Sequence, residues 1–109
     1  MDTPIARPTA IVDLVDYQPG SVVSRVVIRN SGAVMTLFAF AQGEGLTEHM
    51  SPHEATVQLL EGEARITIAG EPHTVRAGEM LHLPAAVPHA LHGEQSFKML
   101  LTILKQPPQ

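Results

Sequence analysis

The sequence contains no cysteine and no tryptophan, and only three Phe and one Tyr occur among its 109 residues. The lack of cysteine excludes disulfides, thiolate metal sites and cysteine nucleophiles, so any metal must be bound by nitrogen and oxygen atoms. With so few aromatic residues, the core must be built mainly from Val, Leu, Ile, Ala and Met. Hydrophobic residues make up 44% of the chain and charged residues 17%, which is typical of a folded protein rather than a disordered one.

Basic residues are also scarce. Seven Lys and Arg against eleven Asp and Glu give a formal net charge of -4. The basic residues are scattered, so we expect neither a nucleic-acid partner nor an anionic membrane as partner. No stretch approaches the roughly 20 apolar residues of a membrane-spanning helix, and residues 1–15 do not have the pattern of a signal peptide. We therefore expect a cytoplasmic protein.

Helical periodicity is missing as well, because apolar residues do not recur at intervals of three and four over the length of a helix. Short runs rich in Val, Ile and Thr alternate with turn residues instead. The runs are SVVSRVVIRN, AVMTLFAFA, ATVQLL, EARITIA, HTVRA, MLHLP, PHALHG and FKMLLTIL. About eight to ten short strands of this kind predict an all-β fold, an antiparallel sandwich or barrel.

The chain is expected to form one domain, since 109 residues suffice for a single core. Residues 1–20 are rich in proline and read as an N-terminal arm, with a candidate short strand around Ala10 to Val15. Residues 21–105 form the predicted barrel. The tail over residues 106–109 contains two prolines and cannot extend a sheet.

Two motifs with fixed spacing lie in the central part of the chain. In the first, Gly43 is followed by five residues, His49, Met50 and Ser51, then three residues and Ala55, then six residues and Gly62.

The second motif lies further along the chain. Gly78 is followed by five residues, Pro84, Ala85 and Ala86, then two residues and His89, then three residues and Gly93.

In spacing, order and separation, the two motifs resemble those of small single-domain cupins, and the resemblance covers roughly residues 33–104. It implies a jelly-roll barrel, also called a double-stranded β-helix. It also implies a divalent metal site on the inner face of the barrel, made by two histidines and a glutamate of the first motif and a histidine of the second. This sequence keeps His49 and His89 of that set, but has Ser51 and Ala55 in place of the other two ligands.

A divalent transition metal generally has at least three protein ligands, so another residue must join the two histidines. His53 is the candidate, because it has the same odd parity as His49 and would face the same way in an extended chain, although Pro52 bends the backbone there. Glu54 has the opposite parity and is expected to point away. The alternative is that His53 is a loop residue, and that His49 and His89 are relics of a lost metal site.

Two functional hypotheses follow. In the first, His49, His89 and His53 bind a divalent metal such as Zn, Ni, Fe or Mn in the barrel cavity, and through it a small oxygen-bearing molecule. The resemblance then implies dioxygenase-like or isomerase-like chemistry, with the metal as Lewis acid and template. In the second, the protein is a metal-free, non-catalytic module that binds or senses a small molecule. No nucleotide or organic cofactor is expected, and no catalytic residue is assigned.

Assembly can also be predicted. SVVSRVVIRN, AVMTLFAFA and FKMLLTIL carry apolar residues at both parities, more than one barrel interior can bury. In a chain without helices, the second cover is most simply another copy of the same sheet, and the resemblance likewise implies a homodimer. We therefore expect a twofold dimer. The alternative is a monomer in which the residue 1–20 arm folds over its own barrel.

Overall fold

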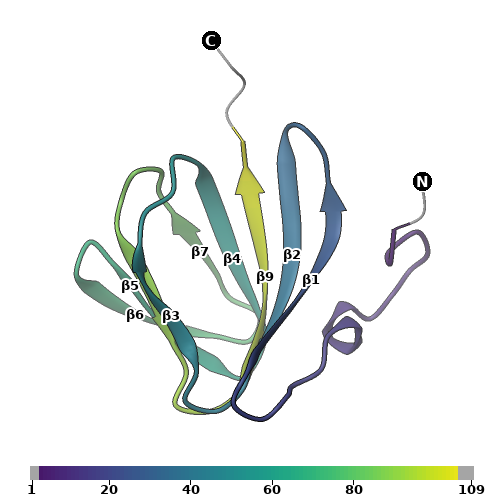
Figure 1. Cartoon of the computed structure of the whole chain (residues 1–109), viewed down its shortest axis with the longest axis horizontal. Coiled ribbons are helices and arrows are strands. Elements are labelled where there is room, and N and C mark those ends of the chain that lie inside the picture. The colour runs from purple at the N-terminus through teal and green to yellow at the C-terminus, as the bar shows by residue number, and fades with distance from the viewer. Residues whose placement is uncertain (1–2, 106–109) are drawn as a thin grey trace.

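The computed structural model describes residues 3–105, and Figure 1 shows an almost entirely β structure. No helix in this range is long and apolar enough to cross a membrane. The elements in chain order are the 3-10 helix η1 (Ile11–Leu14) and the strands β1 (Val22–Arg29), β2 (Ala33–Phe40), β3 (Gly45–His49), β4 (Glu54–Glu61), β5 (Glu63–Ile68), β6 (Glu71–Arg76), β7 (Met80–Leu83), β8 (His89–His92) and β9 (Phe97–Leu104).

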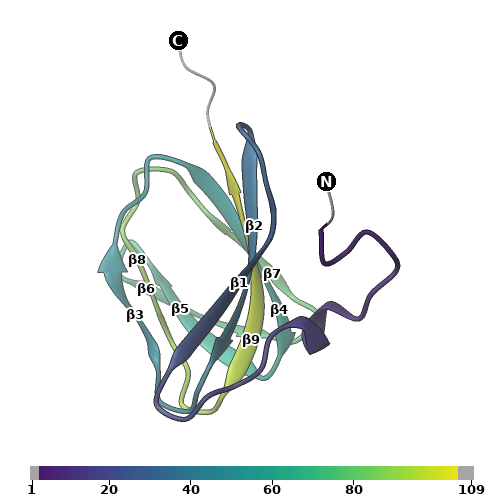
Figure 2. The same cartoon turned by 45° about the vertical axis from the view of Figure 1, so that its right-hand side comes forward.

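The strands form two facing antiparallel sheets. One has five strands in the order β1-β2-β9-β4-β7, and the other has four in the order β3-β8-β5-β6. Apart from the hairpins β1-β2 and β5-β6, each connection carries the chain from one sheet to the other. This confirms the predicted all-β jelly roll. The sheets meet at one end and splay apart at the other (Figures 1 and 2), and no strand pair joins them within residues 3–105.

Strand alternation decides which side chains fill the space between the sheets. In β4, every second residue is buried, and Ala55, Val57 and Leu59 face the interior. The rings of Phe40, at the end of β2, and Phe97, at the start of β9, are stacked with centroids 4.4 Å apart. The buried cluster comprises Phe40, Ala55, Val57, Leu59, Ala64, Ile66, Val75, Leu83, Leu91, Phe97 and Met99.

The interior is filled at one end only. Along β9, the inward residues change from buried Met99 to half-buried Leu101 and Ile103. Their partners on β2 follow the same gradient, because Phe38 and Thr36 are half-buried where Phe40 is fully buried. The splayed end therefore presents partly exposed apolar side chains on its inner face.

The arm contains a 3-10 helix, so the candidate strand around Ala10 to Val15 is wrong. Two carbonyl oxygens of the helix accept hydrogen bonds from cationic side chains of the five-stranded sheet. Nζ of Lys98 donates to the Val12 carbonyl over 2.8 Å, and Nη1 of Arg25 donates to the Leu14 carbonyl over 3.1 Å. Apolar alternation alone could not reveal this, because the two donors lie far away in the sequence.

The arm packs over the outer face of the five-stranded sheet of its own chain (Figure 2). Val15 is buried there against Val27, Leu37 and Ala39. Lys98 is buried on the same face, with its Nζ 5.0 Å from the ring centroid of Tyr17. Burial, together with a hydrogen bond to the nearby Glu61 carboxylate, raises the pKa of Tyr17 above its ordinary value.

The glycines between strands have the backbone conformation that tight turns require. Gly62, Gly70 and Gly78 all have positive φ, as their place between strands predicts. In the β5-β6 hairpin, both Ala69 and Gly70 have positive φ, the geometry of a type I′ turn. A Cβ on Gly62 would lie 2.5 Å from the Ser96 carbonyl oxygen, so only glycine fits there.

Replacing Lys98 by methionine is expected to destabilise the protein. The change keeps most of the side-chain bulk but removes the donor to Val12, and a hydrogen bond from a charged group contributes about 1.5–3 kcal/mol. We expect the Tm to fall by roughly 6–20 °C, measured by circular dichroism. Lys105→Met is the matched control, and an equal loss in both variants would contradict the anchoring role of Lys98.

Candidate functional site

An irregularity in β3 brings His49 to the inner face of the barrel. Leu46 of β3 pairs with Leu91 of β8, but the next registered pair joins His49 to His89. In a regular ladder, Glu48 would lie opposite His89. The extra residue shifts the register by one, as a β-bulge does, and the imidazole takes the place of the carboxylate.

Close approach of β3 and β8 supports this pairing. Gly45 lies opposite His92, and a Cβ added to Gly45 would overlap the carbonyl oxygen of Leu91. Glycine is therefore required here, because any side chain would push the two strands apart.

The two imidazoles meet edge to face, with ring centroids 4.3 Å apart and an interplanar angle of 67°. His89 is buried and only 8% exposed, whereas His49 is exposed. The pair therefore has one face toward the barrel and one toward solvent. The motif spacing predicts that His49 and His89 lie close together, and they do so as neighbours on β3 and β8 of one sheet rather than across the barrel.

Each ring is oriented by the backbone carbonyl group two residues before it in the chain. Nδ1 of His49 lies 2.8 Å from the carbonyl oxygen of Thr47, and Nδ1 of His89 lies 3.3 Å from that of Val87. A carbonyl only accepts hydrogen bonds, so each Nδ1 carries a proton and donates. Each Nε2 is then left with a lone pair. This is the tautomer in which histidine binds a metal through Nε2.

Burial lowers the pKa of His89 below its ordinary value of 6.5, and the nearby His49 adds to the effect against the opposing hydrogen bond to Val87. His89 is therefore neutral at pH 7, and its Nε2 can accept a proton or a metal ion.

The loop before β8 positions His89 through contacts that the sequence reasoning missed. The Glu54 side chain points away from the interior, as its parity predicts. Its carboxylate accepts a hydrogen bond from the backbone N–H of Ala85 and lies 3.1 Å from Nε2 of His82. The hydrogen bond from the Ala85 N–H is the main cause that lowers the pKa of Glu54, and the hydrogen bond with His82 is the second. The partner of Glu54 lies 31 residues away in the sequence, so only the fold reveals this contact.

Ala86 lies in the second motif, two residues after Pro84, and it adopts φ 61°. Its N–H donates to the carbonyl oxygen of Ser51 over 2.7 Å. This bond ties the loop that precedes His89 to the loop that follows His49, and it holds a non-glycine residue in the left-handed region.

His53 is not brought together with the pair. Its backbone N–H donates to Oγ of Ser51 over 3.2 Å, while its Nδ1 is buried without a hydrogen-bond partner in the part of the chain that the structure describes. Across residues 3–105, no three His, Asp or Glu side chains are arranged to hold a metal ion. The donors at the site thus fit a divalent transition metal in kind, but the assembled pair is one short of three.

Ala86→Gly is expected to stabilise the protein. An L-residue in the left-handed region costs about 1–2 kcal/mol, of which the greater freedom of glycine in the unfolded chain offsets about 0.4–1 kcal/mol. The Tm should rise by a few degrees in a thermal melt. Ala85→Gly is the matched control and should lower it, because Ala85 has no positive φ to relieve. A loss of Tm in both variants would contradict strain at Ala86.

No protein of curated function matches the chain. A conserved protein of unknown function from Streptococcus pyogenes is 31% identical, with a TM-score of 0.88 over 94% of this chain and 90% of the other. A cupin superfamily protein from Desulfitobacterium hafniense is 28% identical, with a TM-score of 0.90 over 97% of both chains.

A cupin 2 conserved barrel domain protein from Leptotrichia buccalis is 39% identical, with a TM-score of 0.83 over 86% of this chain, and the match spans 46% of that longer protein. The family model described as the cupin domain matches residues 36–103, which include both motif histidines. The chain therefore belongs to the cupin family.

Proposed function

We propose that the protein binds a divalent transition metal, Zn, Ni, Fe or Mn, at the splayed end of the barrel, and that His49 and His89 are its ligands. The observation that carries this proposal is the pair itself. Two imidazoles lie 4.3 Å apart between centroids, and each Nδ1 is engaged by a backbone carbonyl. Neither Nε2 is engaged by these two hydrogen bonds, so both nitrogens remain available as ligands.

His53 is the proposed third ligand. Its buried Nδ1 has no partner among residues 3–105, and a buried nitrogen without a hydrogen bond is costly unless something occupies it. His53 lies in the short segment between β3 and β4, four residues after His49. A change in this segment would bring a third nitrogen to the pair and complete the minimum ligand set.

The surroundings of the pair favour a small, partly apolar molecule as the second ligand. Leu101 and Ile103 line the inner face of the splayed end and are only half-buried. They offer apolar contact to a molecule whose polar end reaches the imidazoles. When bound, the metal would supply Lewis acidity and a template for an oxygen-bearing group, in support of dioxygenase-like or isomerase-like chemistry.

The chain's own groups can act on such a molecule directly. A neutral His89, protected from water by burial, can accept a proton at Nε2, while the exposed His49 can exchange one with solvent. The same features would serve a metal-free module that binds or senses a small molecule without catalysis, which is the second candidate. It is favoured by the lack of a third assembled ligand within residues 3–105.

Metal content separates the two candidates. Protein purified without an affinity tag should carry about one equivalent of metal per chain by elemental analysis, and His49→Ala or His89→Ala should remove it. Occupancy should fall as the pH drops below about 6.5, because protonated imidazole cannot bind metal. His92→Ala, a histidine on the outer face of the same sheet, should leave the metal content unchanged.

His53→Ala tests the third ligand in the same measurement. We expect it to weaken the affinity for added Zn at least tenfold in a competition with a chromophoric chelator, since each ligand lost leaves the ion less well held. Wild-type protein that neither carries nor takes up metal would reject the first candidate and leave the metal-free module.

We also propose a twofold homodimer that packs the outer face of the five-stranded sheet against its copy. The arm covers this face over Leu37 and Ala39 but leaves Ile28 37% and Leu104 48% exposed. Ile28 pairs with Met35 in the register of β1 and β2, on the face that carries the arm. A second copy would cover these apolar side chains.

Light scattering at micromolar concentration tests the dimer. The mass should be about twice the chain mass of 11.7 kDa, and Ile28→Glu should reduce it to one chain because a charge would be buried at the interface. Met50→Glu, at an exposed position beside His49, is the control and should remain dimeric. A wild-type mass near 11.7 kDa would contradict the dimer. The arm would then be the only segment that packs on the outer face of the sheet.

A further inference from the structure

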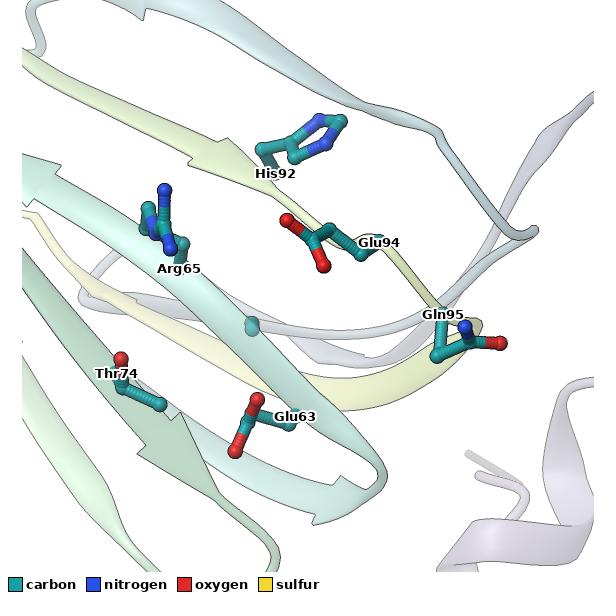
Figure 3. A pocket seen from close by; sticks show the side chains of 7 residues that line it. Glu63, Arg65, Thr74, His92, Glu94 and Gln95 are labelled. Carbon is teal, nitrogen blue, oxygen red and sulfur yellow. The ribbon is translucent and has the colours of Figure 1, made fainter.

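A second polar site lies on the outside of the four-stranded sheet, on the face turned away from the imidazole pair. It is a hollow of about 120 Å³, lined by Glu63, Ala64, Arg65, Thr74, His92, Glu94 and Gln95 (Figure 3). We propose that this hollow binds a small free α-amino acid, with its carboxylate held by Arg65 and its ammonium group held by Glu94.

Strand register builds the anion-binding side of the hollow. Arg65 on β5 pairs with His92 on β8 and with Thr74 on β6, so the three residues form one row across the sheet. All three are exposed on the outer face. A guanidinium flanked by an imidazole and a hydroxyl supplies several N–H and O–H donors in a line, which suits a carboxylate.

The charges in the hollow leave one cation and one anion free. Glu63 is paired with Nε of Arg76 at 3.1 Å, so its charge is largely balanced. Within residues 3–105, neither Arg65 nor Glu94 has an opposite charge within ion-pair distance. In Figure 3, the Glu94 carboxylate points from the loop after β8 across the hollow toward Arg65, while the Gln95 amide points away.

A ligand that joins these two groups must itself carry both charges. An anion alone would leave Glu94 unpaired beside it, and a cation alone would do the same to Arg65, so each would meet a like charge. A zwitterion satisfies both groups at once. An α-amino acid carries the carboxylate and the ammonium on one carbon, which suits two protein groups that face each other across a narrow space.

The volume limits the size of the ligand. Pockets for drug-sized ligands have roughly 300–1,000 Å³, and this hollow has about 120 Å³. Only a molecule of a few non-hydrogen atoms fits, such as glycine or alanine. Because the lining side chains are exposed, solvent screens the charges, and the affinity should lie in the millimolar range.

Backbone amide NMR with glycine as the titrant tests the proposal. We expect saturable shifts concentrated in β5, β8 and residues 93–95. Acetate and methylammonium, which each carry only one of the two charges, should bind at least tenfold more weakly. Arg65→Gln and Glu94→Gln should each weaken glycine binding about tenfold, since each removes one charged partner.

Matched charge changes elsewhere serve as controls. Arg29→Gln on β1 and Glu71→Gln on β6 should leave the glycine titration unchanged. Acetate binding as tight as glycine would overturn the proposal in favour of an anion site. Shifts that do not saturate would overturn the proposal as well. So would shifts that are lost in His49→Ala but kept in Arg65→Gln, because glycine would then be bound at the imidazole pair.

Discussion

The buried cluster between the two sheets is the contact on which their arrangement depends, and the stacked rings of Phe40 and Phe97 are its largest members. These rings belong to neighbouring strands and are fully buried, and with so few aromatic residues in the chain they supply much of the large apolar area of the core. Both lie at one end of the five-stranded sheet, in the buried cluster that it shares with the four-stranded sheet. Without comparable side chains at the other end, the inward faces of β2 and β9 become half-buried there, and a space with an apolar lining results.

At that open end, the chain departs from regular geometry in two places, and both concern the histidine pair. The bulge in β3 exchanges Glu48 for His49 on the inner face, and Ala86 accepts a left-handed conformation to bond to Ser51. Such irregularities cost stability and persist where the surrounding structure holds them. Their position beside two imidazoles with free Nε2 atoms is consistent with a binding role for this end of the barrel.

Much of the fold could be predicted from the sequence, and for definite reasons. The alternation of Ala55, Val57 and Leu59 and the turns at Gly62, Gly70 and Gly78 are local signals, so the strands were predictable; the spacing of the two motifs added the pairing of His49 with His89. The 3-10 helix was not predictable, because Lys98 and Arg25 stabilise it from distant strands. The position of His53 could not be predicted from parity, because parity applies to a strand and His53 lies between β3 and β4.

The anchoring of each imidazole to the carbonyl oxygen two residues before it in the chain has a consequence for how this site can evolve. The orientation of the pair depends on the backbone rather than on the side chains at positions 51 and 55, so substitutions there need not disturb it. Ligands can be lost or regained singly while the two remaining histidines keep their geometry. Sequences intermediate between a full metal centre and a simple binding pocket can therefore still fold on this scaffold.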